Sequence, residues 1–156
     1  MFYRHSVHIP WSIEGCRAQL LEEPQHWLPE PVAQLAGDRS FEMPVGPGAP
    51  AALISKRVEL DVGPVAQTGD WLTIPVSWRA TGPSELFPTF DGELRLEPVD
   101  RAACRLEISG NYEPPLGPVG REIDAALMHN VAQGTIRNFV EKVAARVSNL
   151  AADRSA

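Results

Sequence analysis

Cysteine is scarce in this sequence: Cys16 and Cys104 are the only two, and they lie far apart without a CxxC spacing. Such a pair provides neither the disulfide framework of a small secreted protein nor a zinc site. Both fall on apolar faces of predicted elements, which indicates small buried side chains.

Metal-binding and catalytic signatures are also missing. There is no GxSxG nucleophile elbow and no HExxH helix, and the proline-rich Val45–Pro50 turn donates too few N–H groups to hold a phosphate. The histidines match no metal-ligand spacing, and a lone histidine is more often a hydrogen-bonded structural residue than a base. They are His5, His8, His26 and His129. We expect no metal and no other cofactor, and the sequence identifies no catalytic residue.

Basic residues are few and scattered. Lys and Arg number 14 against 20 Asp and Glu, which gives a formal net charge of −6. Nucleic-acid binding needs a clustered basic face, so we expect no nucleic-acid partner. No apolar run approaches the roughly 20 residues that span a bilayer, so we expect no stable membrane insertion. Residues 1–5 lack the pattern of a secretory signal peptide, and we expect a cytoplasmic location.

The composition is that of an ordinary globular protein, with 156 residues, of which 44% are hydrophobic and 22% charged. A chain of this length buries roughly 70% of the surface that its unfolded form exposes. We expect a single domain over residues 1–150 and a disordered tail over residues 151–156.

The first thirty residues predict a strand followed by two short helices. Phe2–Ile9 alternates in the manner of a strand and is ended by Pro10. Ser12 can cap a helix over Ile13–Leu21, and Gln25–Leu28 forms a second short helix after Pro24.

From Arg39 the hydrophobic period changes to two. Strands are predicted over 39–45, 51–62, 71–80, 87–98 and 102–112, and short turns separate them. Regular alternation indicates that one face of the sheet is exposed to solvent and the other is buried, as in an antiparallel meander. Pro75 lies inside one of these strands and predicts a bulge or an edge-facing position.

A long helical pattern follows Leu116 and runs to about Leu150. The residues of its stripe recur every four positions from Val119 to Val147 and include Phe139, so the stripe drifts by about 40° per step around the helix. Gly134 lies where the stripe changes face, and we hypothesise a kink, π-bulge or strong curvature between Asn130 and Gly134. The alternative is that the first half of the helix packs on the Trp27 region or on another subunit.

This order of elements resembles the START-like superfamily, also called the SRPBCC or polyketide-cyclase and lipid-transport group. The similar segments are His5–Pro10, Trp27–Val32, Ile74–Ala80 and Gly110–Pro115, and the likeness covers residues 2–150. The resemblance implies a helix-grip fold of the α+β class. In that fold a curved antiparallel sheet of about six strands wraps around a long C-terminal helix, and two short helices follow the first strand.

The resemblance also implies an apolar small molecule held between sheet and helix, with no catalytic residue common to the superfamily. Inward strand positions and the first half of the long helix would then line the cavity, although the same residues would suit a filled core. Tyr112 and Asn130 would offer polar groups to a ligand, unless Tyr112 bonds the backbone instead. The predicted lining residues are Trp78, Phe90, Leu94, Leu106, Ile108, Tyr112, Ile123, Leu127 and Asn130.

Three functions remain open at this stage. The leading one is binding or carriage of an apolar or amphipathic small molecule of the lipid, polyketide or isoprenoid type. The second is an enzyme of the polyketide aromatase/cyclase type, which needs at least two polar groups converging on one substrate position; the sequence offers no convincing pair. The third is a protein-interaction domain with a collapsed core and an exposed apolar patch. The oligomeric state stays open.

Overall fold

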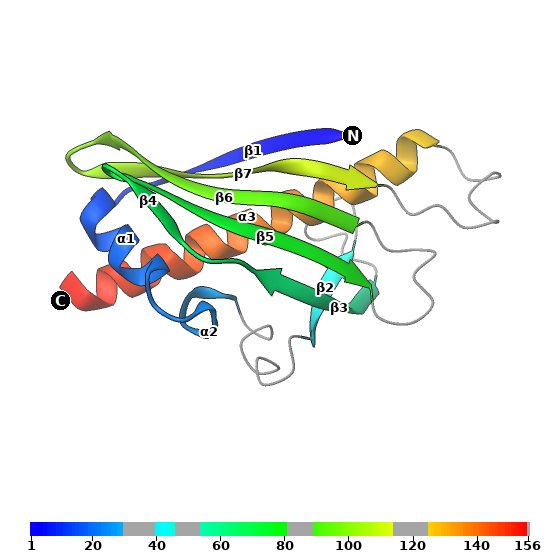
Figure 1. The fold of residues 1–156 in the computed structure, drawn as a ribbon, viewed down its shortest axis with the longest axis horizontal. Coiled ribbons are helices and arrows are strands. Elements are labelled where there is room, and N and C mark those ends of the chain that lie inside the picture. Colours follow the sequence, from blue (N-terminus) through cyan, green and yellow to red (C-terminus); the bar gives the residue numbers. More distant parts are fainter. Residues whose placement is uncertain (30–39, 46–53, 81–88, 114–124, 156) are drawn as a thin grey trace.

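The fold is an antiparallel sheet curved around one long C-terminal helix (Figure 1). A computed structural model describes residues 1–29, 40–45, 54–80, 89–113 and 125–155. Within these residues, two short helices follow the first strand, as predicted from the sequence. The helix-grip architecture predicted from the sequence is therefore confirmed.

The described elements follow one another along the chain with nearly the predicted bounds. They are β1 (Phe2–Ile9), α1 (Ile13–Leu20), α2 (Pro24–Trp27), β2 (Ser40–Val45), β3 (Ile54–Val62), β4 (Ala66–Thr68), β5 (Trp71–Ala80), β6 (Thr89–Asp100), β7 (Ala103–Glu113) and α3 (Ala125–Ser155).

Local chemistry explains where several of these elements begin and end. The Ser12 hydroxyl accepts a hydrogen bond from the Gly15 N–H at 3.3 Å, which caps α1 as predicted. Pro24 occupies the first turn of α2, where its missing N–H costs no helical hydrogen bond. Between β6 and β7, Asp100 Oδ1 accepts the Ala102 N–H at 2.8 Å and stabilises the tight turn.

Six strands form a continuous path in the order β1-β7-β6-β5-β3-β2, and all the pairs along it are antiparallel. The short strand β4, which the sequence did not predict, pairs with β5 beyond the end of β3 and brings the described sheet to seven strands. Because β3 and β4 both pair with β5, they act as one strand with an interruption between them.

The interruption is a β-bulge opposite Pro75. Val62 pairs with Val76 and Ala66 with Thr73, so residues 63–65 oppose only residues 74–75. Pro75 accepts the Gly63 N–H at 2.8 Å through its carbonyl but has no N–H to donate. The bulge predicted from Pro75 is therefore present.

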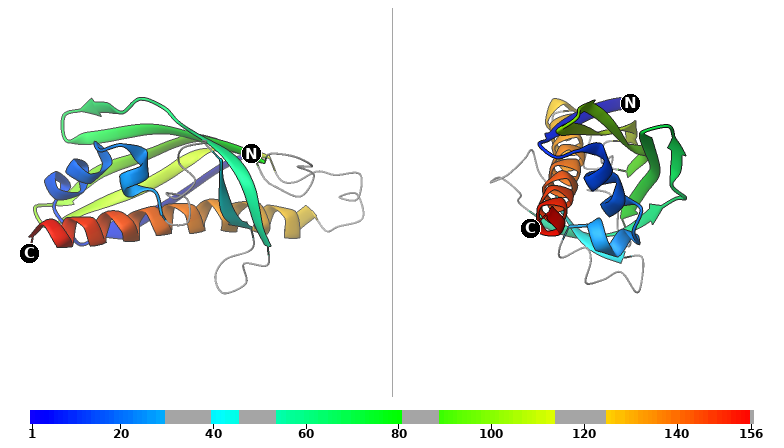
Figure 2. Two further views of the ribbon diagram at one scale, coloured as in Figure 1. Left: turned by 90° about the horizontal axis from the view of Figure 1, so that it is seen from below. Right: turned by 90° about the vertical axis from the view of Figure 1, so that its left-hand side faces the viewer.

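The helix α3 spans the open side of the curved sheet. It contacts β1 and β2, which lie at the two ends of the strand order, and also β7. Viewed along the helix, the sheet arcs from β1 to β3, and α1 lies inside the arc at the C-terminal end of α3 (Figure 2). None of the described helices is both long enough and apolar enough to span a bilayer.

The predicted kink in α3 is wrong. The helix runs as an uninterrupted α-helix from Ala125 to Ser155, with Gly134 inside it. Its buried residues recur at spacings of three or four, which keeps them on one face of a straight helix. They include Ala132, Ile136, Phe139, Val140, Val143, Val147 and Ala151.

The expected disordered tail is also helical where the structure describes it. Ala151 is only 3% exposed, and α3 continues to Ser155. Arg154 reaches Glu22 at the α1–α2 junction at 3.3 Å. Docking of α1 and α2 against the last turns of α3 gives these residues a surface to pack on, which the isolated sequence pattern did not reveal.

Candidate functional site

A row of four buried side chains crosses the concave face of the sheet at one level. The strand register pairs Leu60 with Trp78, Trp78 with Phe90, and Phe90 with Tyr112 across β3, β5, β6 and β7. All four are at most 6% exposed. The N-terminal ammonium of Met1 donates to the Tyr112 carbonyl at 2.9 Å, which places the chain's first residue at the same level. The row is thus an apolar wall with one phenol at its end.

Trp78 is the central aromatic residue of this wall. Its ring stacks on Phe90 with centroids 4.6 Å apart and meets Phe139 of α3 at 5.1 Å. The indole Nε1 is buried and has no hydrogen-bond partner among the residues that the structure describes. A buried donor without a partner costs about 1–3 kcal/mol, and buried indole N–H groups usually find one. This atom is an available donor inside an apolar environment.

A polar cluster occupies the other end of the row. The Tyr112 hydroxyl lies 3.1 Å from Nδ1 of His129, and the Gln133 side-chain amide donates to the same hydroxyl at 3.1 Å. Because Gln133 is a donor, the phenol proton is free to bond Nδ1 of a neutral His129. Tyr112 is buried, whereas His129 and Gln133 are half-buried. Three polar side chains therefore converge where sheet and helix meet.

The cluster begins a series of polar contacts along one side of α3. Residues four apart on a helix share a face, and Arg137 and Glu141 follow Gln133 at that spacing. Arg137 hydrogen bonds Tyr3, and Glu141 pairs with His5 Nε2 at 3.3 Å. Burial raises the pKa of Tyr3, and the Arg137 cation opposes that rise. These contacts fix the helix against the edge strand β1.

Two glycines make room for the aromatic wall. Gly92 and Gly110 are register partners in the row next to Phe90 and Tyr112. A Cβ at Gly92 would lie 2.7 Å from Phe90 Cζ, and one at Gly110 would lie 2.9 Å from the same atom. The ring of Phe90 therefore lies over the glycine backbone, which no other residue type would permit.

Six of the predicted lining residues are buried in one cluster with α3. Phe90, Trp78 and Tyr112 form the row described above, and Leu94, Ile108 and Leu106 extend it towards α1. Asn130 differs from the prediction because it is exposed to solvent. Leu127 lies in the first turn of α3, and Ile123 falls outside the described residues.

Sequence reasoning missed three residues of this site: His129, Gln133 and Phe139. Phe139 belongs to the four-residue stripe, but the hypothesised kink directed it elsewhere. His129 was treated as an isolated histidine. Its i, i+4 relation to Gln133 was the available signal, since it puts both side chains on one helix face.

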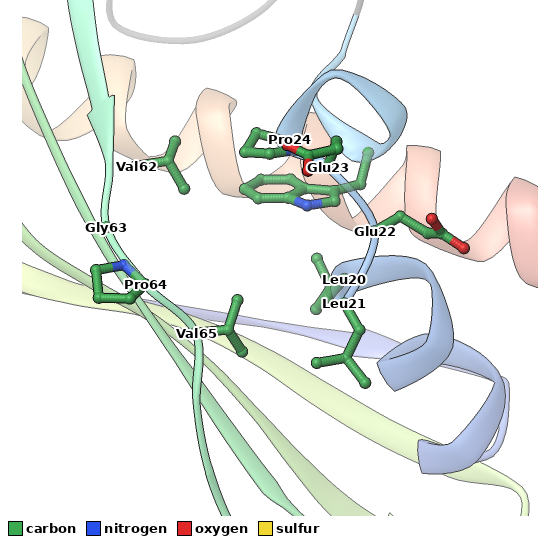
Figure 3. A pocket seen from close by; sticks show the side chains of 10 residues that line it. Leu20, Leu21, Glu22, Glu23, Pro24, Val62, Gly63, Pro64 and Val65 are labelled. Carbon is green, nitrogen blue, oxygen red and sulfur yellow. The ribbon is translucent and has the colours of Figure 1, made fainter.

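A separate hollow of about 350 Å³ lies between the α1–α2 junction and the bulge of β3–β4 (Figure 3). Residues 20–24 and Trp27 line one side, and residues 62–65 line the other. None of the predicted lining residues contributes to it. Within the described part of the chain, no group of three or more His, Cys, Asp or Glu side chains is arranged to hold a metal ion.

Comparison with known proteins gives matches at the level of structure. No family model and no curated protein matches the sequence. A conserved protein from Geobacillus kaustophilus superposes with a TM-score of 0.55 and 16% identity over 96% of both chains. Norcoclaurine synthase from Thalictrum flavum superposes with a TM-score of 0.55 and 14% identity over 98% of this chain and 87% of that chain.

The same synthase has also been solved in complex with dopamine and hydroxybenzaldehyde. That structure matches with a TM-score of 0.53 and 13% identity, over 100% of this chain and 88% of that chain. Identities this low establish a shared fold and carry no residue roles across.

Proposed function

Because the chain has a helix-grip fold of the SRPBCC type, we propose that it binds an apolar or amphipathic small molecule between the sheet and α3. The ligand is of the lipid, polyketide or isoprenoid type, and the protein carries it in the cytoplasm. The binding site is centred on the row of Trp78, Phe90 and Tyr112, and Leu94, Leu106 and Ile108 form its deeper part.

The unpartnered N–H of Trp78 is the observation that carries this proposal. Folding has buried this donor between Phe90 and Phe139 without satisfying it among the described residues. Buried donors of this kind mark strain, an ordered water or a ligand position. A ligand carbonyl, ether or hydroxyl oxygen at Nε1 would recover the lost hydrogen bond.

A second polar position defines the size of the ligand. Trp78 and Tyr112 lie on β5 and β7, one on each side of Phe90 on β6, so their backbones are two strand spacings or about 10 Å apart. A molecule with oxygen atoms at both ends and an apolar body across Phe90 fits that arrangement. Burial of its apolar surface, at about 25 cal/mol per Å², supplies most of the affinity.

Native mass spectrometry of protein purified from its own host tests the proposal. We expect an adduct of lipid-like mass that disappears on denaturation, and we expect Trp78→Phe to retain much less of it. The matched control is Trp27→Phe, because Trp27 is also buried but its N–H is not among the buried groups without a partner in the described residues. Empty wild-type protein that shows no thermal shift with fatty acids, isoprenoid alcohols or aromatic polyketides contradicts ligand binding.

The polar cluster favours a second candidate, an enzyme of the polyketide aromatase/cyclase type. Such an enzyme needs two or more polar groups within reach of one substrate position, and Tyr112 with His129 and Gln133 meets that condition. His129 would accept the phenol proton as the Tyr112 oxygen takes a proton from a substrate hydroxyl, and the reverse transfer would return a proton to the substrate oxygen.

The adduct itself distinguishes a carrier from an enzyme. An enzyme lacking its proton-transfer group retains unreacted substrate, so Tyr112→Phe protein would carry a molecule of different composition from the wild-type adduct. A carrier would carry the same molecule in both proteins. Identical adducts, with the Tyr112→Phe protein properly folded by circular dichroism, exclude the enzymatic candidate.

A further inference from the structure

We infer that the hollow between the α1–α2 junction and the β3–β4 bulge is a second binding site, which accepts a small organic cation with an apolar body. The inference does not depend on the ligand proposed above, since the hollow shares no residue with the Trp78–Phe90–Tyr112 row. Its volume of about 350 Å³ lies within the range of small-molecule sites.

The backbone builds one wall of this hollow. Pro75 cannot donate a hydrogen bond to the neighbouring strand, so residues 63–65 bulge where β3 passes into β4. A Cβ at Gly63 would lie 2.9 Å from Pro75 Cβ, so the close approach of the bulge to Pro75 requires glycine. The strand side of the hollow is therefore set by the backbone.

The interior of the hollow is apolar and partly aromatic. The hollow is lined by Leu20 and Trp27, which belong to the hydrophobic core, and by Val62, which packs against that core. Leu21 and Val65 also line it, yet they are 52% and 38% exposed. In Figure 3 the Val62 and Val65 side chains point from the strand side towards Leu20 and Leu21 on the helix side. An apolar guest would cover side chains that water now contacts.

The acidic residues at the rim of the hollow favour a positively charged ligand. Glu22 and Glu23 both line the hollow. The Glu22 carboxylate forms an ion pair with Arg154, with Oε1 and Nη2 3.3 Å apart. The Glu23 carboxylate makes no ion pair or hydrogen bond within the described residues. The chain carries a net charge of −6, which adds long-range attraction for a cation.

Paired amine and alcohol probes test this assignment. Phenethylamine and 2-phenylethanol share an apolar body and differ in charge. We would titrate each into protein with labelled Leu and Val methyl groups and follow the NMR shifts. We expect shifts confined to Leu20, Leu21, Val62 and Val65 with both probes. We also expect the amine to bind roughly two- to five-fold more tightly at low salt, and the preference to disappear at 1 M salt.

Variants separate the contribution of Glu23 from general charge effects. Glu23→Gln should remove the amine preference, whereas Glu14→Gln should keep it, because Glu14 is also exposed but does not line the hollow. Val65→Trp should fill the hollow and abolish the shifts, and Trp78→Phe should leave them unchanged. Equal affinities for amine and alcohol, or equal effects of the two glutamine variants, overturn the cation assignment. Shifts centred on methyl groups around Trp78 overturn the site.

Discussion

The hydroxyl of Tyr112 lies 3.1 Å from Nδ1 of His129, and this pair links the end of β7 to an early turn of α3. Elsewhere along α3 the contact with the sheet is largely apolar, through residues such as Ile136, Val140 and Val143. Apolar contact tolerates small displacements of the helix, whereas a hydrogen bond loses strength quickly with distance and angle. Together with the Arg137–Tyr3 and Glu141–His5 contacts, the pair therefore fixes the axial position of α3 relative to the sheet.

Replacing Tyr112 by Phe tests this contribution to stability. The change removes the hydrogen bonds to His129 and Gln133 but keeps the aromatic ring in the core. Both partners are half-buried and can bond water, so we expect the free energy of unfolding to fall by about 1–2 kcal/mol. Urea denaturation measures it. In a double-mutant cycle with His129→Leu, we expect a coupling free energy of about 0.5–1.5 kcal/mol between the two positions. Zero coupling would show that the hydrogen bond does not contribute to stability.

The same substitution at two buried tryptophans should cost different amounts of stability. Trp78→Phe loses apolar contact but also removes a donor that has no partner in the described structure. Trp27→Phe loses similar contact without that compensation, since Trp27 is 1% exposed and its N–H is not among the unpartnered buried groups. In ligand-free protein we expect Trp78→Phe to be less destabilising than Trp27→Phe by about 1 kcal/mol. Equal losses in urea denaturation would mean that the Trp78 N–H is satisfied.

Hydrophobic period accounts for how much of the fold the sequence could predict. In a strand, a side chain points to one face or the other, so alternation alone assigned Trp78, Leu94 and Ile108 to the concave face. A second local rule indicated a bulge or an edge-facing position at Pro75, because proline lacks the N–H that a sheet needs, and the structure has the bulge. These predictions rest on local properties of the sequence, and the structure confirms them.

Relations between distant segments could not be obtained in this way. The Tyr112–His129 contact depends on how far α3 slides along the sheet, which periodicity does not specify. The kink hypothesis failed because the four-residue stripe omitted Ile136 and Val140, which complete an apolar face on the described helix. The hollow combines a helix junction with a strand bulge, and each looks like ordinary surface in isolation.

Gly92 provides a sharp test of the packing on the concave face. A Cβ there would lie 2.1 Å from the Ser109 carbonyl oxygen and 2.7 Å from Gly110 Cα, and neither backbone atom can move without disturbing β7. We expect Gly92→Ala to destabilise the protein by about 3 kcal/mol or more. Gly15→Ala is the matched control, because its nearest neighbour outside the local helix backbone is Ser12 Oγ at 3.5 Å.

The control should change stability in the opposite direction. Alanine is favoured over glycine inside a helix by about 1 kcal/mol, so Gly15→Ala should raise the thermal midpoint while Gly92→Ala lowers it. Comparable midpoints for the two variants would contradict the close approach of β6 and β7 at this level.

The pH dependence of stability follows from the buried thiol of Cys104. The hydrogen bond with Cys16 and burial together raise the pKa of Cys104 well above its ordinary value. An unfolded cysteine ionises near pH 8.5, whereas the folded thiol stays protonated. Its contribution to stability is therefore complete below that pH and is lost as the pH rises further, by up to about 1.4 kcal/mol per pH unit. The same hydrogen bond lowers the pKa of Cys16, so Cys16 contributes a change of opposite sign as the pH rises towards about 8.5, and the decline belongs to the range above that pH. Urea midpoints between pH 7 and pH 9.5 measure the decline, and this range stops below the ionisation of Tyr3, whose pKa burial also raises.

Cys104→Ala removes the titrating group and should flatten the decline even if it lowers the midpoint at pH 7. A decline of the same slope in Cys104→Ala would assign the effect to other groups.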